Sequence, residues 1–217
     1  TMARIGGFSL SPNGKQVVYS VSLPSIQDNK AKTQLFLVNS DGSGRKALTD
    51  GTHTAVSPRW IEDGKRIAYL TVIEGEMQLV SILPDGTDQR QVTRIPGGIT
   101  GYLYSQDGKQ LVYTADIKLP NEAKDRNPDL DLMYKHWDEW VETAPHTFVA
   151  SLAQQPITQG KDLLEGELFE APMKPHSDES DIAITPALEI ILDAAKQATT
   201  LSGVEVAVIV AASRMRH

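Results

Sequence analysis

Apolar and polar residues alternate in short segments through the first two-thirds of the chain, and an Asn-Gly or Asp-Gly pair follows many of these segments. Alternation with a period of two places the apolar side chains on one face, which is typical of a half-buried β-strand. The glycine of each pair supplies the positive φ that a tight hairpin needs. The pattern therefore predicts strands joined by hairpins over this part of the chain.

The alternating segments also repeat. Residues 8–19 resemble residues 57–69 and 102–113, and the last residues of these segments lie 50 and 44 positions apart. A second element, residues 35–49, returns as residues 79–93, again 44 positions later. Each unit contains two hairpins, and four short strands in about 45 residues is the size of one propeller blade.

One blade cannot bury both of its faces, so blades must stack side by side around an axis. The sequence thus predicts a mainly β fold, an incomplete β-propeller over residues 1–175. It would contain about three four-stranded blades, at about residues 7–50, 51–95 and 96–160. A ring of seven blades would need more than about 300 residues, so the ring cannot close here and the chain is expected to be a fragment. An unrelated meander or sandwich is the alternative.

Residues 117–143 break the alternation with a proline and a charged stretch. The apolar residues that follow recur at helical spacing: Leu130, Met133, Trp137 and Trp140. This spacing predicts a short helical insert between strands of the third blade.

The pattern changes again after about residue 176. A helical period over residues 185–201 is followed by an almost continuous apolar run over residues 204–212. Such a run is typical of a strand buried on both faces of a parallel sheet. Residues 176–217 are therefore expected to form an α/β helix–strand tail of different origin from the propeller. The run is far shorter than the ~20 residues of a membrane-spanning helix, so no membrane contact is predicted.

Composition excludes several classes of function. The chain has 21 Lys and Arg against 28 Asp and Glu, a net charge of -7, which argues against nucleic-acid binding. It has no cysteine, which excludes a thiol nucleophile, disulfides and any cysteine-ligated metal. The hydrophobic fraction of 40% and the charged fraction of 23% are ordinary for a folded globular chain.

The repeats carry a family resemblance. The spacing Ser-Pro-x-Gly-Lys, then an apolar strand, then Asp-Gly and Leu-Thr, resembles the TolB-type propeller repeat. Residues 2–174 as a whole resemble the N-terminal β-propeller of the prolyl oligopeptidase clan of serine peptidases. Within the clan, the run DLMYKHWDEWVET at residues 131–143 is similar to an insert of the bacterial dipeptidyl-peptidase V and acylaminoacyl-peptidase group. The resemblance alone implies a periplasmic or other extracytoplasmic location.

The same resemblance limits the activity expected of this chain. In that clan the catalytic serine stands on a Gly-x-Ser-x-Gly elbow of a separate α/β-hydrolase domain, and this chain contains no such motif. No catalytic residue is therefore predicted here. The chain is expected to be a non-catalytic propeller fragment that filters or positions peptide substrate for a serine exopeptidase and is inactive alone. Its expected partners are peptide substrate, the missing blades and the α/β-hydrolase domain, together with copies of itself through uncovered apolar faces.

The candidate substrate-binding residues lie in the insert: Trp137, Asp138, Glu139 and Trp140. Carboxylates beside tryptophans can hold a cation by ion pairing and cation–π contact. The resemblance implies that Asp138 or Glu139 holds the N-terminal ammonium group of a peptide. In the alternative interpretation, the two tryptophans fix the insert to its blade and the carboxylates are solvated.

No metal or other cofactor is predicted. Residues 125–136 superficially resemble the opening of a calcium loop, but Leu130 replaces the required glycine and His136 replaces the bidentate glutamate. His136 and His146 have no third ligand in the sequence around them.

Two further functions stay open at this point. One is a TolB-like propeller that binds protein partners without hydrolysis. The other rests on the tail, residues 184–217, which resembles a helix and strand of the adenosine deaminase family. The metal-binding histidine pair and catalytic glutamate of that family have no match here, so this alternative is a deaminase-derived fragment without the activity.

Overall fold

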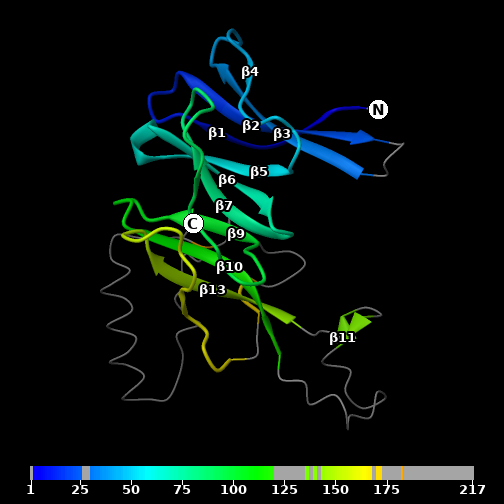
Figure 1. Cartoon of the computed structure of the whole chain (residues 1–217), viewed down its shortest axis with the longest axis vertical. Helices are drawn as coiled ribbons and strands as arrows, with labels where there is room; N and C mark the ends of the chain where they lie inside the picture. Colours follow the sequence, from blue (N-terminus) through cyan, green and yellow to red (C-terminus); the bar gives the residue numbers. More distant parts are fainter. Residues whose placement is uncertain are drawn as a thin grey trace, which may run out of the picture.

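The structure of the chain is a computed structural model, and it describes residues 2–25, 30–119, 135–136, 139–140, 143–167, 170–172 and 182. Three four-stranded sheets follow one another along the chain and lie in a stack, with a small two-stranded hairpin beside the third (Figure 1). This arrangement confirms the mainly β class and the incomplete propeller. The predicted helix and strand of the tail fall outside the described residues.

All three sheets are antiparallel meanders, with strands in chain order from one edge to the other. The first contains β1 (Arg4–Leu10), β2 (Gln16–Ser25), β3 (Lys30–Asn39) and β4 (Lys46–Ala47). The second contains β5 (Ala55–Ile61), β6 (Arg66–Ile73), β7 (Glu76–Ile82) and β8 (Arg90–Gln91), with a 3-10 turn (Glu62–Gly64) after β5. The third contains β9 (Gly101–Tyr104), β10 (Gln110–Lys118), β13 (Thr143–Ser151) and β14 (Lys161–Asp162).

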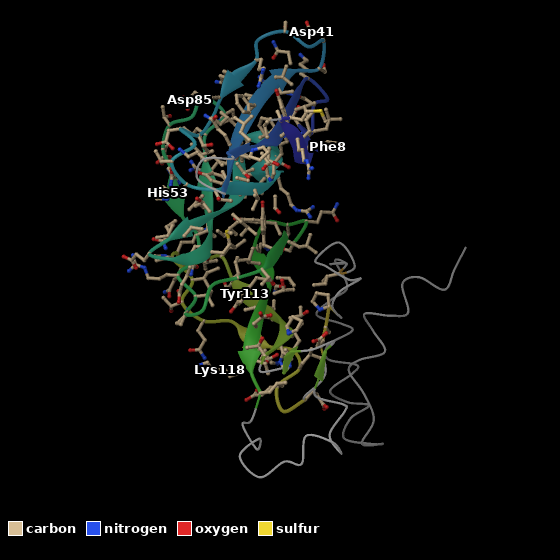
Figure 2. The ribbon with its side chains drawn as sticks, turned by 90° about the vertical axis from the view of Figure 1, so that its right-hand side faces the viewer. Phe8, Asp41, His53, Asp85, Tyr113 and Lys118 are labelled. Atoms are coloured by element: carbon tan, nitrogen blue, oxygen red, sulfur yellow. The ribbon has the colours of Figure 1, made fainter. Side chains whose placement is uncertain are left out.

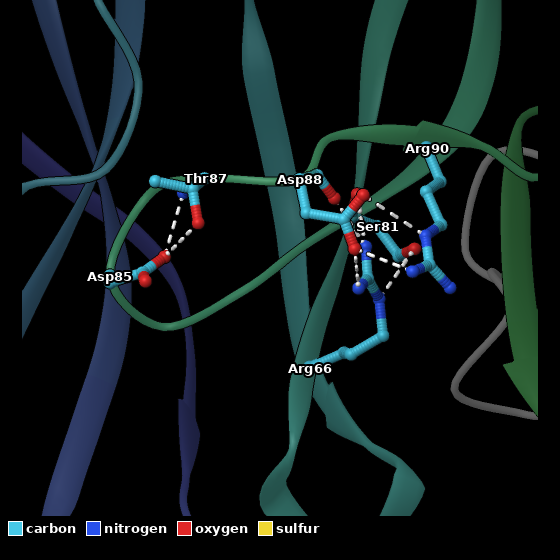
Figure 3. Close-up of polar contacts among 6 residues, drawn as sticks. All are labelled: Arg66, Ser81, Asp85, Thr87, Asp88 and Arg90. Carbon is cyan, nitrogen blue, oxygen red and sulfur yellow. Dashed lines mark hydrogen bonds and ion pairs between the residues drawn. The ribbon is translucent and has the colours of Figure 1, made fainter.

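In several of the Asp-Gly and Asn-Gly turns, the aspartate or asparagine side chain bonds the backbone N–H two residues on. Asp85 Oδ1 accepts hydrogen bonds from the backbone N–H and the hydroxyl of Thr87, at 2.8 and 2.6 Å (Figure 3). Asp41 accepts the same pair from Ser43. A short carboxylate that bonds the backbone two residues on is the reason aspartate suits such turns.

Two apolar cores hold the three sheets together. Between the first and second sheets lie side chains at most 2% exposed: Val18, Leu35, Leu37, Ile67, Tyr69 and Val80. Between the second and third sheets lies a second such group: Ala68, Leu70, Leu79, Ile99, Tyr102, Leu111 and Tyr113. Tyr69 is therefore a core residue, as the repeat pattern predicts, and the partly buried Trp60 packs against the same core.

Polar contacts add to the packing between neighbouring sheets. The indole N–H of Trp60 on β5 donates to the backbone oxygen of Ser9 on β1, at 3.2 Å. The hydroxyl of Tyr102 on β9 lies 2.7 Å from the backbone oxygen of Ser57 and 2.9 Å from that of Ala68. The first strand of each sheet, β1, β5 or β9, is thus hydrogen-bonded to a neighbouring sheet.

The prediction that the insert is helical is wrong for the part of it that the structure describes. Instead, β11 (Lys135–His136) and β12 (Glu139–Trp140) pair as a short antiparallel hairpin. Helical spacing of a few apolar residues cannot by itself specify a helix this short, because a helix of one or two turns is only marginally stable in water. Tryptophan also suits a strand.

Within the described residues, no helix has the length and apolar character that crossing a bilayer requires.

Removing the Tyr102 hydroxyl should destabilise the chain. Tyr102 is 1% exposed, and its single O–H lies within reach of the buried backbone oxygen of Ala68 and the partly buried one of Ser57, so Tyr102→Phe removes the hydrogen bond to one of them. We expect a loss of about 1–3 kcal/mol in the free energy of unfolding, measured by urea denaturation. Tyr104→Phe on the same strand is the control, because its hydroxyl has no hydrogen-bond partner among the described residues; an equal loss in both variants would contradict the role of the bond.

The aspartate turns should make stability depend on pH. Hydrogen bonds from Thr87 lower the pKa of Asp85 below its usual value of 3.8, and those from Ser43 do the same for Asp41. A lowered pKa in the folded state means that the unfolded chain takes up protons first, so this stability is lost as the pH falls below about 3.8. Asp85→Asn keeps the acceptor oxygen and removes the titration. Its melting temperature should therefore fall less steeply between pH 5 and 3 than that of the unchanged chain.

Candidate functional site

The insert is carried by the two longest paired strands of the third sheet. Strands β10 and β13 pair over nine residues, from Gln110 opposite Ser151 to Lys118 opposite Thr143. The neighbouring β9 has only four residues, so the far end of this pair extends beyond the rest of its sheet. Figure 1 shows β11 past that end, away from the stack of sheets. The insert is thus held at the end of a two-stranded arm.

The structure describes the backbone of only two of the four predicted site residues. Glu139 lies opposite His136, and Trp140 lies opposite Lys135, in the β11–β12 hairpin. Trp137 and Asp138 fall outside the described residues. Whether the four side chains gather into one site stays a prediction, although the arm and the hairpin define where such a site would be.

A cavity of about 560 Å³ lies between the second and third sheets, at the end where their hairpin turns meet. Its walls include Glu62 and Asp63 from the turn after β5, and Tyr104 from β9. Burial, followed by the negative charge of Glu62, raises the pKa of the Tyr104 hydroxyl well above its usual range. The Tyr104 hydroxyl is protonated at physiological pH, as tyrosine ordinarily is, and is a hydrogen-bond donor in the cavity wall.

One wall of this cavity contains a buried arginine that the sequence analysis missed. The side chain of Arg66 is 4% exposed and donates from Nη1 to Asp88 Oδ2 at 2.9 Å and from Nε to Ser81 Oγ at 3.1 Å (Figure 3). Arg90 lies 2.6 Å from the same carboxylate and is 60% exposed. Hydrogen bonds from Arg90 and then Arg66 lower the pKa of Asp88. The cluster is internally satisfied, so it attaches the outer strand β8 to its sheet.

A signal for this cluster exists in the repeats. Arg66 occupies the position after Gly-Lys that is glutamine in the other two copies, Gln16 and Gln110. A single arginine at the start of a buried strand needs an acidic partner. Asp88, in the next turn, is that partner.

His146 lies within a strand of the third sheet. It belongs to β13, is fully buried, and its Nδ1 is 2.8 Å from Asp162 Oδ2. Its Nε2 has no hydrogen-bond partner among the described residues. The preceding residue, Pro145, also belongs to the strand. Within the described parts of the chain, no group of three or more histidine, aspartate or glutamate residues is arranged to hold a metal ion.

The stacked four-stranded sheets and their repeats show that the chain is an incomplete β-propeller. Acylaminoacyl peptidase of Pyrococcus horikoshii shares the fold with a TM-score of 0.57 at 16% identity, over 75% of this chain and 25% of that one. No family model matches the chain.

Comparison of sequences is more specific. The chain is 90% identical over 210 residues to dipeptidyl-peptidase 5 of Porphyromonas endodontalis, and 48% identical over 211 residues to dipeptidyl-peptidase 5 of Porphyromonas gingivalis. Both matches take in 93% of this chain. The chain spans 30% and 31% of the length of these relatives. The predicted resemblance to dipeptidyl-peptidases is thus confirmed, for a part of such a protein; the separate origin of the tail stays a prediction.

Asp88 and Arg90 of the Arg66 cluster should contribute unequally to the free energy of unfolding. Asp88→Ala leaves the buried Arg66 guanidinium without its counter-charge, which is strongly unfavourable. Arg90→Ala removes only an exposed pairing and should change the free energy of unfolding by less than about 1 kcal/mol. We therefore expect Asp88→Ala to lower the melting temperature by clearly more than Arg90→Ala, measured by circular dichroism. Equal effects would show that Arg66 does not depend on Asp88.

Proposed function

We propose that this chain is the propeller part of a dipeptidyl-peptidase and that it positions the peptide substrate without performing the hydrolysis. The observation that carries the proposal is the 90% identity over 210 residues to a protein named dipeptidyl-peptidase 5. Because the chain spans only 30% of that relative, the activity belongs to the longer protein.

The insert is the part that we assign to substrate recognition. A dipeptidyl-peptidase must recognise the free amino terminus of a peptide, and a carboxylate beside aromatic rings is suited to an ammonium group. Asp138 and Glu139 are carboxylates next to Trp137 and Trp140 in the sequence. The extended β10–β13 arm supports the proposal, because it places the insert away from the stacked sheets, where it can reach a substrate outside the propeller body.

Glu139→Gln in the full-length enzyme tests this assignment. Loss of a charge-assisted hydrogen bond of about 1.5–3 kcal/mol should lower kcat/KM on dipeptidyl chromogenic substrates by ~10-fold or more. A substrate whose amino group is acetylated has no ammonium group to pair with Glu139. Its low turnover should therefore be the same in Glu139→Gln as in the unchanged enzyme.

Glu165→Gln is the matched control, because Glu165 is an exposed glutamate in the loop after β14 and has no ion pair among the described residues. Both variants should keep the melting temperature of the unchanged enzyme. If Glu139→Gln left kcat/KM unchanged, the carboxylate would be a solvated surface group.

The 217-residue chain by itself should hydrolyse nothing. Acyl transfer by a serine peptidase needs a nucleophile, a base, a group that orients the base and donors for the oxyanion, all within hydrogen-bond reach. Purified chain incubated with dipeptidyl chromogenic substrates should give the rate of the buffer blank. Turnover that is abolished by a serine-directed covalent inhibitor, with the label mapped onto this chain, would refute the prediction.

A further inference from the structure

A second cavity, of about 270 Å³, lies between the first and second sheets, next to their last strands β4 and β8. Its walls include Leu48, just after β4, and Ile82, at the end of β7. The turn between β7 and β8 comes close to this wall, because a β-carbon on Gly86 would lie 3.6 Å from the backbone oxygen of Leu48. Figure 2 shows His53, which also lines the cavity, on the side of the molecule away from Phe8. Since a water takes about 30 Å³ in the liquid, a molecule of several heavy atoms fits here.

Two buried hydroxyl groups line this cavity. Tyr69 and Thr71 lie on the same face of β6 and are 2% and 6% exposed. Neither hydroxyl has a hydrogen-bond partner among the described residues. In the same part of the chain, His146 Nε2 is the one buried side-chain polar atom that lacks both a partner and contact with solvent. The two hydroxyls are therefore open to the cavity. Because buried polar groups are ordinarily hydrogen-bonded, they mark a place for a polar ligand.

The corresponding tyrosine of the third sheet has a partner inside the chain. Tyr113 occupies the same repeat position as Tyr69, and the backbone of Gly160 hydrogen-bonds its hydroxyl. Gly160 directly precedes the last strand of its sheet, and the residue in that place in the second sheet is Gln89, which lines the cavity. A β-carbon on Gly160 would lie 2.6 Å from the Tyr113 oxygen, so a residue with a side chain cannot come as close. Gln89 therefore leaves space beside Tyr69 that the third sheet does not have.

The charge of the cavity favours a cation. Asp50 is the only aspartate, glutamate, lysine or arginine among the residues that line it. Asp50 Oδ1 accepts hydrogen bonds from the backbone N–H and the hydroxyl of Thr52, at 2.9 and 2.7 Å, whereas Oδ2 has no hydrogen-bond partner among the described residues. The bonds from Thr52, and to a smaller extent His53, lower the pKa of Asp50. Burial, followed by the negative charge of Asp50, raises the pKa of the Tyr69 hydroxyl to about 12. The carboxylate therefore acts on the same space as the open hydroxyl.

We propose that this cavity binds a primary ammonium group on a short aliphatic stem. An ammonium group has three donors and no acceptor, so it suits the free oxygen of Asp50 and the lone pairs of the Tyr69 hydroxyl. The stem packs on Leu48, Ala55 and Ile82, which are 6%, 1% and 3% exposed. Two sources share this chemistry, a free alkylamine and the lysine side chain of another protein. The cavity lies between the first two sheets and the insert belongs to the third, so this inference goes beyond the substrate role and does not rest on it.

Saturation-transfer difference NMR on the full-length protein tests the proposal, because it detects weak binding of small molecules to a large protein. The probes are n-butylammonium, 1-butanol as its neutral match and butyrate as its anionic match. We expect n-butylammonium to bind, and the other two probes to have dissociation constants at least ~3-fold higher, because they cannot pair with Asp50. The protein carries Glu139→Gln throughout, so that the proposed substrate site does not contribute to the signal.

Two variants locate the bound probe. Asp50→Asn and Tyr69→Phe should each raise the dissociation constant of n-butylammonium by roughly 3-fold or more. Asp41→Asn is the matched control, because Asp41 forms the same kind of turn with Ser43 but does not line the cavity. Tyr69→Phe should leave the melting temperature of the probe-free protein unchanged, since its hydroxyl has no partner among the described residues. A loss of binding in this variant therefore does not come from a loss of folding.

Several outcomes would overturn the proposal: no binding of n-butylammonium, equal binding of 1-butanol, tighter binding of butyrate, or binding of n-butylammonium that neither Asp50→Asn nor Tyr69→Phe weakens. If the proposal stands, Nα-acetyl-lysine N-methylamide as a fourth probe distinguishes the two sources. Tighter binding than that of n-butylammonium assigns the cavity to a lysine side chain of a partner protein, and weaker binding assigns it to a free alkylamine. Unchanged peptidase kinetics in Glu139→Gln would remove the substrate assignment and leave this inference standing.

Discussion

The packing of sheet on sheet is the constraint on which the rest of the structure depends. Each sheet has apolar side chains on both of its faces. Both faces are therefore stabilised when another part of the protein covers them. Both faces of the second sheet are covered, one by Val18 and Leu35 of the first sheet and the other by Leu111 and Tyr113 of the third. Among the described residues, the first sheet has a core on only one of its faces. Stability in this architecture is therefore shared between neighbours and does not belong to any sheet alone.

The residue after Gly-Lys makes different polar contacts in different repeats. Gln16 donates from Nε2 to Asn39 Oδ1 at 3.4 Å, a weak neutral contact. Arg66 at the corresponding position is buried and ion-paired with Asp88. Both residues begin the second strand of their sheet, so the difference lies in what a later turn supplies. Asn39 precedes the turn of the first sheet, whereas Asp88 ends that of the second.

Most of the fold could be predicted from the sequence, because its signals are local. Asp-Gly turns and a period of two specify hairpins, and the repeat of hairpins specifies sheets. The β11–β12 hairpin could not be predicted, since four apolar residues at ambiguous spacing fit either a helix or strands. The strand position of His146 is hard to predict, because Pro145 precedes it and proline is rare within a central strand. Strand β14 has only two residues, opposite Phe148 and Val149, so Pro145 lies beyond it and needs no N–H on that side. The candidate substrate-binding residues come from the insert, where no repeat constrains the pattern, so the sequence could name them but could not predict how they are arranged.

The nine-pair ladder between β10 and β13 has an evolutionary consequence. At its far end the ladder holds Lys118 opposite Thr143, the two residues from which the insert departs and to which it returns. The core contacts of the third sheet come from Leu111, Tyr113 and Ala115, which lie well inside the ladder. Changes in the sequence or length of the insert are therefore expected to leave these core side chains in place, so that selection can act on the insert separately from the stability of the sheet.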